Sequence, residues 1–149
     1  MALTIAADHR GFTLKTHIKK YLAGLGISVQ DLGAFTHEEK DDFPDFAATL
    51  GRYVAKNPKN KGIVLCGSGQ GVCIAANKIA GVRAALAWNK KSATLSRSDD
   101  NANVLCLGAD LLSKKNVEEI ISTWLATPFT GKARHLRRLK KITALESKK

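Results

Sequence analysis

The residue best suited to chemistry ends a continuous apolar run. Cys66 is followed at once by the turn Gly67-Ser68-Gly69-Gln70-Gly71, and a helix is expected after it. Glycines let a ligand approach the backbone closely, and the free N–H groups where a helix begins favour negative charge. We therefore expect the Cys66 thiol to ionise more readily than a free thiol and to act as a base or nucleophile. The alternative is that Cys66 only fills the core.

Two further pairs of residues could bind an anion or move a proton. Asp8 and His9 end the first apolar run, where they could bind sugar hydroxyls, shuttle a proton or hold a phosphate. The alternative for this pair is a helix cap with an incidental histidine. Arg134 and Arg138 stand four residues apart, so one helical face presents both guanidiniums, whose geometry suits phosphate. The alternative here is a solvated basic face.

Asp99 and Asp100 form a like-charged pair just before another apolar run. Such pairs usually lie in water, but next to a ligand their mutual repulsion would raise the pKa of one of the two carboxyls and leave it as a proton donor.

The odd number of cysteines and the absence of a Cys-x-x-Cys pair argue against a disulfide framework or a zinc site. Cys73 and Cys106 are expected to be packing residues. The turn after Cys66 matches neither a dinucleotide fingerprint nor a P-loop, so we expect no nucleotide cofactor there.

The elements that must position these residues alternate between two kinds of pattern. Short β-rich runs predict strands at residues 3–7, 27–32, 62–66, 82–88 and 104–107. Amphipathic stretches predict helices at residues 12–25, 44–56, 72–79, 90–98, 116–125 and 133–146. This alternation predicts an α/β protein: a three-layer α/β/α sandwich with a five-stranded parallel, Rossmann-like sheet and a basic C-terminal helix. Ligands of such sheets bind at the carboxyl ends of the strands.

Length and composition agree with this architecture. A chain of 149 residues with 44% hydrophobic and 25% charged residues is expected to form one globular domain over residues 1–149. No apolar run could cross a membrane and no secretory signal precedes residue 3, so we expect a cytoplasmic protein without membrane contact. Residues 131–149 hold eight of the 24 basic residues and one of the 13 acidic ones. This basic segment suits a phosphorylated small molecule or nucleic acid, but no aromatic or helix-turn-helix platform accompanies it.

Seven short motifs together resemble one known family. They are Ala7-Asp8-His9-Arg10-Gly11-Phe12, Cys66-Gly67-Ser68-Gly69-Gln70-Gly71, Ile74-Ala75-Ala76-Asn77-Lys78, Gly81-Val82-Arg83-Ala84, Leu95-Ser96-Arg97, Asn101-Ala102-Asn103-Val104-Leu105 and Arg134-His135-x-x-Arg138. The set is similar to the type B ribose-5-phosphate isomerases, within the sugar-phosphate isomerase group that includes galactose-6-phosphate isomerase. The resemblance runs from about residue 3 to residue 146. The combination is specific, although no single motif is.

The resemblance implies that ribose 5-phosphate and ribulose 5-phosphate are interconverted through a cis-enediolate, without metal or cofactor. It gives Cys66 the role of the base that moves a proton between C2 and C1. Ser68 and the amides of the glycine-rich turn (Gly67, Gly69, Gln70 and Gly71) would stabilise the enediolate oxygens. Asp8 and His9 would contact the sugar and its phosphate, and Arg134 and Arg138 would bind the phosphate. The resemblance also implies a homodimer or homotetramer with each site between two subunits, and no nucleic-acid partner.

Three positions depart from the family pattern. Asp99 and Asp100 stand where the family usually has His-Asn, Asp110 replaces an arginine of many members, and Phe43 replaces a tyrosine. We expect Asp99 to take over ring opening as a protonated or water-bridging carboxyl, Asp100 to contact the substrate and Asp110 to oppose phosphate binding. The alternatives are an isomerase of another sugar phosphate, of the allose or galactose 6-phosphate type, and a sugar-phosphate-binding paralogue without catalysis. Nucleic-acid binding ranks last.

Overall fold

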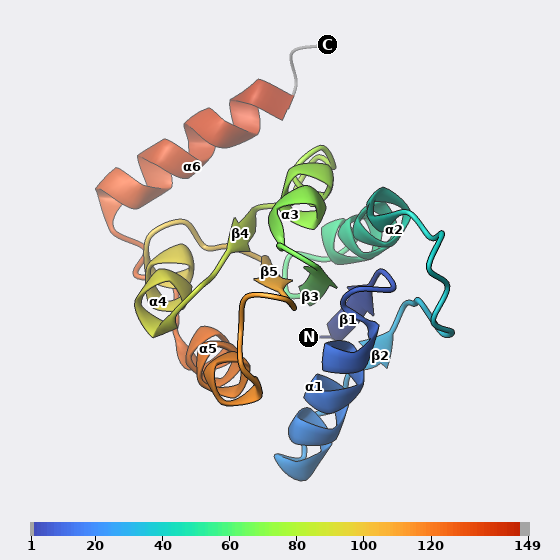
Figure 1. Cartoon of the computed structure of the whole chain (residues 1–149). Coiled ribbons are helices and arrows are strands. Elements are labelled where there is room, and N and C mark those ends of the chain that lie inside the picture. The colour runs from blue at the N-terminus through green and yellow to red at the C-terminus, as the bar shows by residue number, and fades with distance from the viewer. Residues whose placement is uncertain (1, 147–149) are drawn as a thin grey trace.

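In the computed structural model, which describes residues 2–146, five parallel strands form one sheet with helices on both faces (Figure 1). Residues 147–149 of the basic segment lie outside the described residues. The strands are β1 (Leu3–Ala7), β2 (Gln30–Asp31), β3 (Lys61–Cys66), β4 (Ala84–Leu86) and β5 (Val104–Gly108), in the order β2-β1-β3-β5-β4. The helices are α1 (Phe12–Gly24), α2 (Phe43–Ala55), α3 (Gln70–Ala76), α4 (Lys90–Ser98), α5 (Lys114–Ala126) and α6 (Ala133–Glu146). The predicted fold class is confirmed.

The side chains of the central strands point alternately to the two faces of the sheet, and they form one apolar cluster on each face. Ile5, Ile63 and Leu105 pack with residues of α1 and α5 on one face of the sheet. Val64 and Cys106 point to the opposite face and pack with residues of α2 and α3. Successive side chains of a strand point to opposite faces, so strands that are apolar throughout must be covered on both. This is why the continuous apolar runs of the sequence lie in the middle of three layers.

The edge strands are shorter than predicted. The second strand was predicted over residues 27–32 but covers Gln30–Asp31, and the fourth was predicted over residues 82–88 but covers Ala84–Leu86. Each pairs with one neighbour only, so fewer ladder hydrogen bonds extend it. The third helix ends at Ala76, earlier than predicted, because the Asn77 side chain bonds both the N–H and the carbonyl of Ala84 and turns the chain into β4.

The carboxyl ends of β1, β3 and β5 meet at one edge of the sheet, which we call the carboxyl edge. Cys66 pairs with Gly108 in register, and Ala7 pairs with Leu65. Backbone hydrogen bonds continue past the strands: the N–H of Asp8 donates to Leu65 and that of Asp110 donates to Gly67. The turns after these three strands are therefore held side by side.

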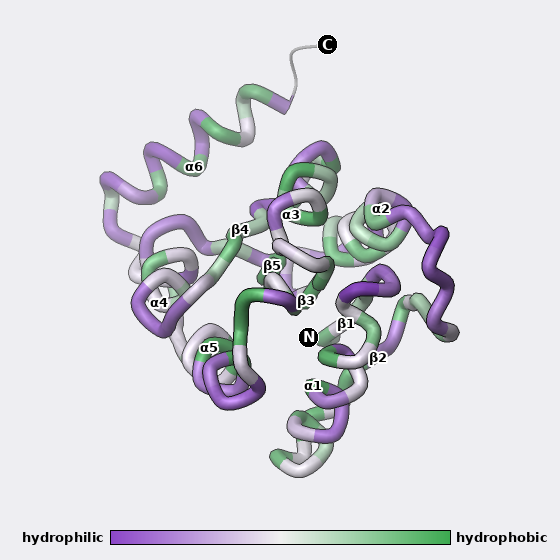
Figure 2. The backbone as a smooth tube through the Cα atoms, viewed as in Figure 1, coloured by the Kyte–Doolittle hydropathy of each residue, from purple (hydrophilic) through white to green (hydrophobic). Residues whose placement is uncertain are grey.

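Helix α6 lies apart from the layered body, on the side of β4 (Figure 1). His135 is its one buried residue, and hydrophilic and hydrophobic residues alternate along its length (Figure 2). Thr130 bonds the carbonyl of Ser98 just before the helix begins, and Glu146 accepts a hydrogen bond from the N–H of Gly81 where it ends. Within residues 2–146, no helix combines the length and the apolar character that crossing a membrane requires.

Candidate active site

One group of predicted site residues comes together at the carboxyl edge. We call Asp8, His9, Cys66, Ser68 and Asp110 the thiol cluster. Cys66 is buried, and its Sγ accepts a hydrogen bond of 3.1 Å from the N–H of Gly69. Ser68 lies in the same turn, where its Oγ accepts from the N–H of Gln70 at 3.3 Å. An N–H that faces the sulfur can compensate negative charge there.

Gly69 is required for this arrangement. Its φ of +77° lies in the left-handed region, which side chains with a Cβ rarely adopt. A Cβ there would lie 2.6 Å from Cδ1 of Leu86 and 2.8 Å from the N atom of Gly108. The ring of Phe43, one of the positions that depart from the family, packs against Gly71 of the same turn. The conformation that directs the Gly69 N–H at the sulfur is thus fixed by close packing.

Asp8 and His9 occupy the turn after β1. Asp8 is buried, and its Oδ1 accepts a hydrogen bond of 3.0 Å from the N–H of Gly11. Burial raises the pKa of Asp8, and the hydrogen bond from Gly11 opposes that shift. Nδ1 of His9 lies 2.6 Å from Oδ1 of Asp41, which also accepts the His9 backbone N–H. This side-chain hydrogen bond to Asp41 raises the pKa of His9 and favours its cationic form.

Asp41 was missed by sequence reasoning because it stands in an acidic loop with nothing to distinguish it. Asp8, His9 and Asp41 are also the one group of three or more His, Cys, Asp or Glu residues within residues 2–146 whose potential metal-ligand atoms all lie within 4.8 Å of one another. The imidazole of His9 already shares a hydrogen bond with Asp41, so the two groups are engaged with each other. The arrangement suits a cationic imidazole that faces an anion.

We predict that Asp41→Asn lowers the pKa of His9. The carboxylate raises that pKa in the folded protein, so His9 stays cationic to higher pH than a free imidazole, and its charge is lost as the pH rises through the raised value. The titration of the His9 ring, followed by NMR, should move to lower pH in Asp41→Asn. Glu39→Gln, in the same loop, is the matched control and should leave the titration in place. An unchanged titration in Asp41→Asn would contradict this assignment.

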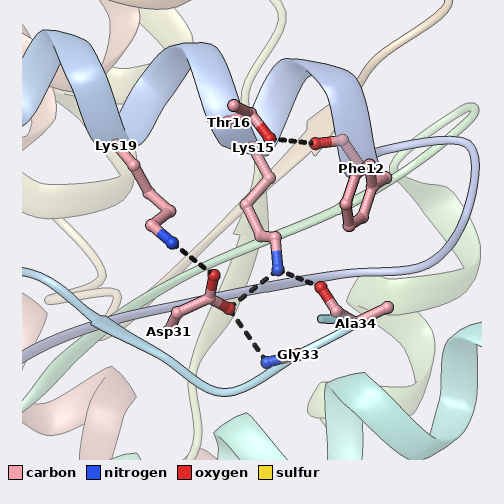
Figure 3. Close-up of polar contacts among 7 residues, drawn as sticks. All are labelled: Phe12, Lys15, Thr16, Lys19, Asp31, Gly33 and Ala34. Carbon is pink, nitrogen blue, oxygen red and sulfur yellow. Dashed lines mark hydrogen bonds and ion pairs between the residues drawn. The ribbon is translucent and has the colours of Figure 1, made fainter. Parts of the chain in front are cut away.

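A buried lysine fixes the start of the loop that carries Asp41. Lys15 of α1 is 2% exposed, and its Nζ donates to Oδ1 of Asp31 at 2.7 Å and to the carbonyl of Ala34 (Figure 3). Lys19 donates to the other oxygen of Asp31, also at 2.7 Å. Burial lowers the pKa of Lys15, and its hydrogen bond to Asp31 opposes that shift. Lys15 was not predicted from the sequence because a lysine within an amphipathic helix usually lies at the surface.

The second group of predicted residues lies around the start of α6. We call Asp99, Asp100, Arg134, His135 and Arg138 the arginine cluster. Nε of Arg134 donates to Nε2 of His135 at 3.1 Å, and Nδ1 of His135 lies 2.9 Å from Oγ1 of Thr130. The Thr130 hydroxyl donates to a carbonyl, so His135 Nδ1 is the donor to Thr130. His135 therefore orients the guanidinium of Arg134.

The aspartates of the arginine cluster are accessible. The Asp99 side chain is 43% exposed; its Oδ1 accepts from the Ser98 hydroxyl at 2.7 Å and lies 3.9 Å from Nδ1 of His135. Asp100 is exposed and lines a groove of about 610 Å³ between α6 and the chain leading into β4. The lining of this groove includes neither Cys66 nor Ser68. Arg138 is exposed one helical turn after Arg134.

The two clusters occupy opposite edges of the sheet. Cys66 pairs with Gly108 at the end of β5, whereas Asp99 and Asp100 precede Val104, at which β5 begins. The length of β5 separates these edges by roughly 13 Å, at about 3.3 Å per residue. The predicted site residues are thus brought together in two groups of one chain and not in one.

Comparison with known proteins agrees with the fold. The family model described as Ribose/Galactose Isomerase matches residues 3–142. The probable ribose-5-phosphate isomerase B of Mycoplasma genitalium is 45% identical over 143 residues, which are 95% of this chain and 93% of that protein. The ribose-5-phosphate isomerase B of Escherichia coli is 36% identical over 99% of this chain and 97% of its own length.

Two solved structures superpose closely on the chain. Ribose-5-phosphate isomerase B from Mycoplasma genitalium with bound ribulose-5-phosphate has a TM-score of 0.95 at 42% identity, covering 99% of this chain and 97% of that one. Ribose-5-phosphate isomerase B from Clostridium thermocellum has a TM-score of 0.94 at 38% identity, covering 99% of both chains. The chain belongs to the ribose/galactose isomerase family. By this membership it is an aldose–ketose isomerase, and it is a homologue of the type B ribose-5-phosphate isomerases.

Proposed function

We propose that the protein interconverts ribose 5-phosphate and ribulose 5-phosphate through a cis-enediolate, with Cys66 as the base. The observation that carries the proposal is the Cys66 sulfur, held by the N–H of Gly69 beside Asp8 and His9 at the carboxyl edge. Parallel sheets bind their ligands at this edge, so the sugar phosphate is proposed to lie there, next to the Cys66 sulfur. The full-length similarity to type B ribose-5-phosphate isomerases supports this choice of substrate.

The proposed reaction uses one base. The Cys66 thiolate removes the proton from C2 of the open-chain aldose; the electron pair of that C–H bond forms the C1–C2 double bond, and the π pair of the C1 carbonyl moves to O1 to give the enediolate. The hydroxyl proton of O2 then passes to O1, which leaves the negative charge on O2. As O2 forms the ketone carbonyl, the C1–C2 π pair takes the proton back from the same sulfur at C1. Ser68 and the N–H groups of the glycine-rich turn stabilise the negative charge that develops on the enediolate oxygens. Asp8 and His9 hold the sugar and its phosphate.

A complete site, as we propose it, needs a second copy of the chain. Arg134 and Arg138 would bind the phosphate, but they belong to the cluster at the edge opposite Cys66. Helix α6 also leaves Leu136, Ile142 and Leu145 from 42% to 68% exposed, and the groove beneath it is open. An apolar helix face of this kind suits burial against a partner. The proposed assembly is a homodimer, or a homotetramer built from such dimers, in which each thiol cluster meets the partner's arginine cluster.

Asp99 is proposed to assist ring opening. Its exposed carboxyl is held by the Ser98 hydroxyl and faces His135, so it can exchange a proton with the ring oxygen or with a bridging water. Asp99→Asn should slow turnover of cyclic ribose 5-phosphate by about 10²-fold or more, which is the lower range for loss of an acid–base group. Turnover of an open-chain analogue should change far less. Equal slowing of both substrates would contradict the role.

The direct test is ketose formation from ribose 5-phosphate by the purified protein. Ribulose 5-phosphate should appear without an added metal or cofactor, and the rate should exceed that with allose 6-phosphate or galactose 6-phosphate. A higher rate with a hexose 6-phosphate would replace the proposed substrate by that sugar. Tight binding of ribose 5-phosphate without turnover would identify a non-catalytic sugar-phosphate-binding protein.

A further inference from the structure

We propose that Arg10 binds the phosphate of the substrate and that Asp110 positions it, an inference that rests on the proposed function. Arg10 follows His9 in the turn after β1. Its guanidinium crosses the turn after β3 and reaches the turn after β5, where Nη2 donates to Oδ2 of Asp110. One side chain thus spans the three turns that surround Cys66.

The position of the guanidinium depends on Gly67. A Cβ at position 67 would lie 2.4 Å from Cζ and 2.5 Å from Nε of Arg10, so the guanidinium occupies space that only a glycine leaves free. Gly67 directly follows Cys66, and its carbonyl accepts the N–H of Asp110 at 2.9 Å. The arginine and its partner are therefore both held against the turn that carries the proposed base.

Most of the hydrogen-bonding capacity of Arg10 is directed outward. A guanidinium carries five N–H donors, and within residues 2–146 the side chain of Arg10 makes one hydrogen bond, the one to Asp110. The side chain is 58% exposed, so its other donors are accessible to a ligand from solvent. A planar guanidinium matches the oxygens of a phosphate in a bidentate contact.

The charges of the carboxyl edge also favour this role. Asp8, Asp41 and Asp110 all lie there, and without Arg10 these carboxylates would oppose the phosphate that His9 and the arginine cluster of a second copy are proposed to bind. The Arg10 guanidinium neutralises Asp110, which sequence reasoning had expected to oppose phosphate binding. Both side chains of this ion pair are more than 40% exposed, and exposed pairs contribute little to stability. A purely structural role therefore explains the pair poorly.

The test is the dissociation constant of inorganic phosphate, measured by calorimetry, together with KM for ribose 5-phosphate. Arg10→Ala should weaken phosphate binding and raise KM by about 10- to 100-fold, the effect of losing a charge-assisted hydrogen bond. The kcat value should change much less. Restoring a guanidinium from the neighbouring turn, in Arg10→Ala with Asp110→Arg, should recover most of the affinity. Arg52→Ala, an exposed arginine on α2, is the matched control and should leave phosphate affinity within twofold of the parent.

Each outcome decides the inference. Phosphate affinity within twofold of the parent in Arg10→Ala would overturn it, as would a large loss of kcat with unchanged phosphate affinity. Failure of Asp110→Arg to recover affinity in the Arg10→Ala background would overturn the placement of the phosphate beside both residues. Arg10-dependent phosphate binding in a protein that does not convert ribose 5-phosphate would support the inference and refute the proposed function. Thermal unfolding of each variant should match the parent, which separates loss of binding from loss of folding.

Discussion

Cys66→Ala should lower kcat for ribose 5-phosphate by about 10²- to 10⁴-fold, the range expected when a positioned base is lost. Binding of ribose 5-phosphate should remain, because its proposed contacts come from Asp8, His9 and the arginines. The substitution exchanges one small buried side chain for another at the end of β3, so the fold should be retained. Initial rates and calorimetric binding, measured on the same preparations, separate the two effects.

Substitution tests this role more cleanly than alkylation does. The hydrogen bond with Cys106 lowers the pKa of Cys73 to about 7, so a reagent selective for thiolates would also label Cys73 near neutral pH. Burial raises the pKa of Cys106 well above the usual range and leaves that thiol unreactive. Cys73→Ala is therefore the control and should retain most of the activity. A kcat of Cys66→Ala within about tenfold of the parent would show that another group is the base.

Two inactive variants should restore each other's activity when they share a dimer. One variant is Cys66→Ala, and the other combines Arg134→Ala with Arg138→Ala. In a mixed dimer, one site receives both defects and the other receives none, since each site takes its thiol cluster and its arginine cluster from different chains. Random mixing makes half of the dimers mixed, so about a quarter of the parent activity should return.

The experiment needs chains that are coexpressed or unfolded and refolded together, with each variant alone as the control. The arginine variant alone should lose roughly 10²- to 10⁴-fold in kcat/KM, as expected for two charge-assisted phosphate contacts. No recovery in dimers that chromatography shows to be mixed would contradict a shared site. That result would mean that Arg134 and Arg138 bind the phosphate of a substrate held by the thiol cluster of their own chain, on the far side of the sheet.

The parts of the fold that sequence reasoning predicted are those set by local pattern. The continuous apolar runs of β1, β3 and β5 predicted buried parallel strands, and the structure confirms them. The bounds of β2 and β4 were wrong because each edge strand is held by one neighbour only, and the extent of that pairing is not visible in the local sequence pattern. Helix α6 agrees with its predicted bounds because its apolar residues recur at helical spacing.

The parts of the site that the sequence did not predict depend on long-range contacts. Arg10 and Asp110 are 100 positions apart, and only the pairing of β1, β3 and β5 brings their turns together. Asp41 reaches His9 because the loop that carries it begins beside Lys15, a buried cation that the helical pattern places at the surface. The separation of the two clusters likewise follows from strand direction rather than from spacing along the chain.

The most direct test of the proposed reaction is to follow hydrogen at C1 and C2 by NMR while ribose 5-phosphate is incubated with the protein in D2O. Exchange of the Cys66 thiol proton with solvent while the enediolate is bound should introduce deuterium at C1 of ribulose 5-phosphate and at C2 of the recovered ribose 5-phosphate. Product formation and exchange should both be about 10²- to 10⁴-fold slower in Cys66→Ala. Product formation or exchange at a rate close to that of the parent in Cys66→Ala would contradict proton transfer by Cys66.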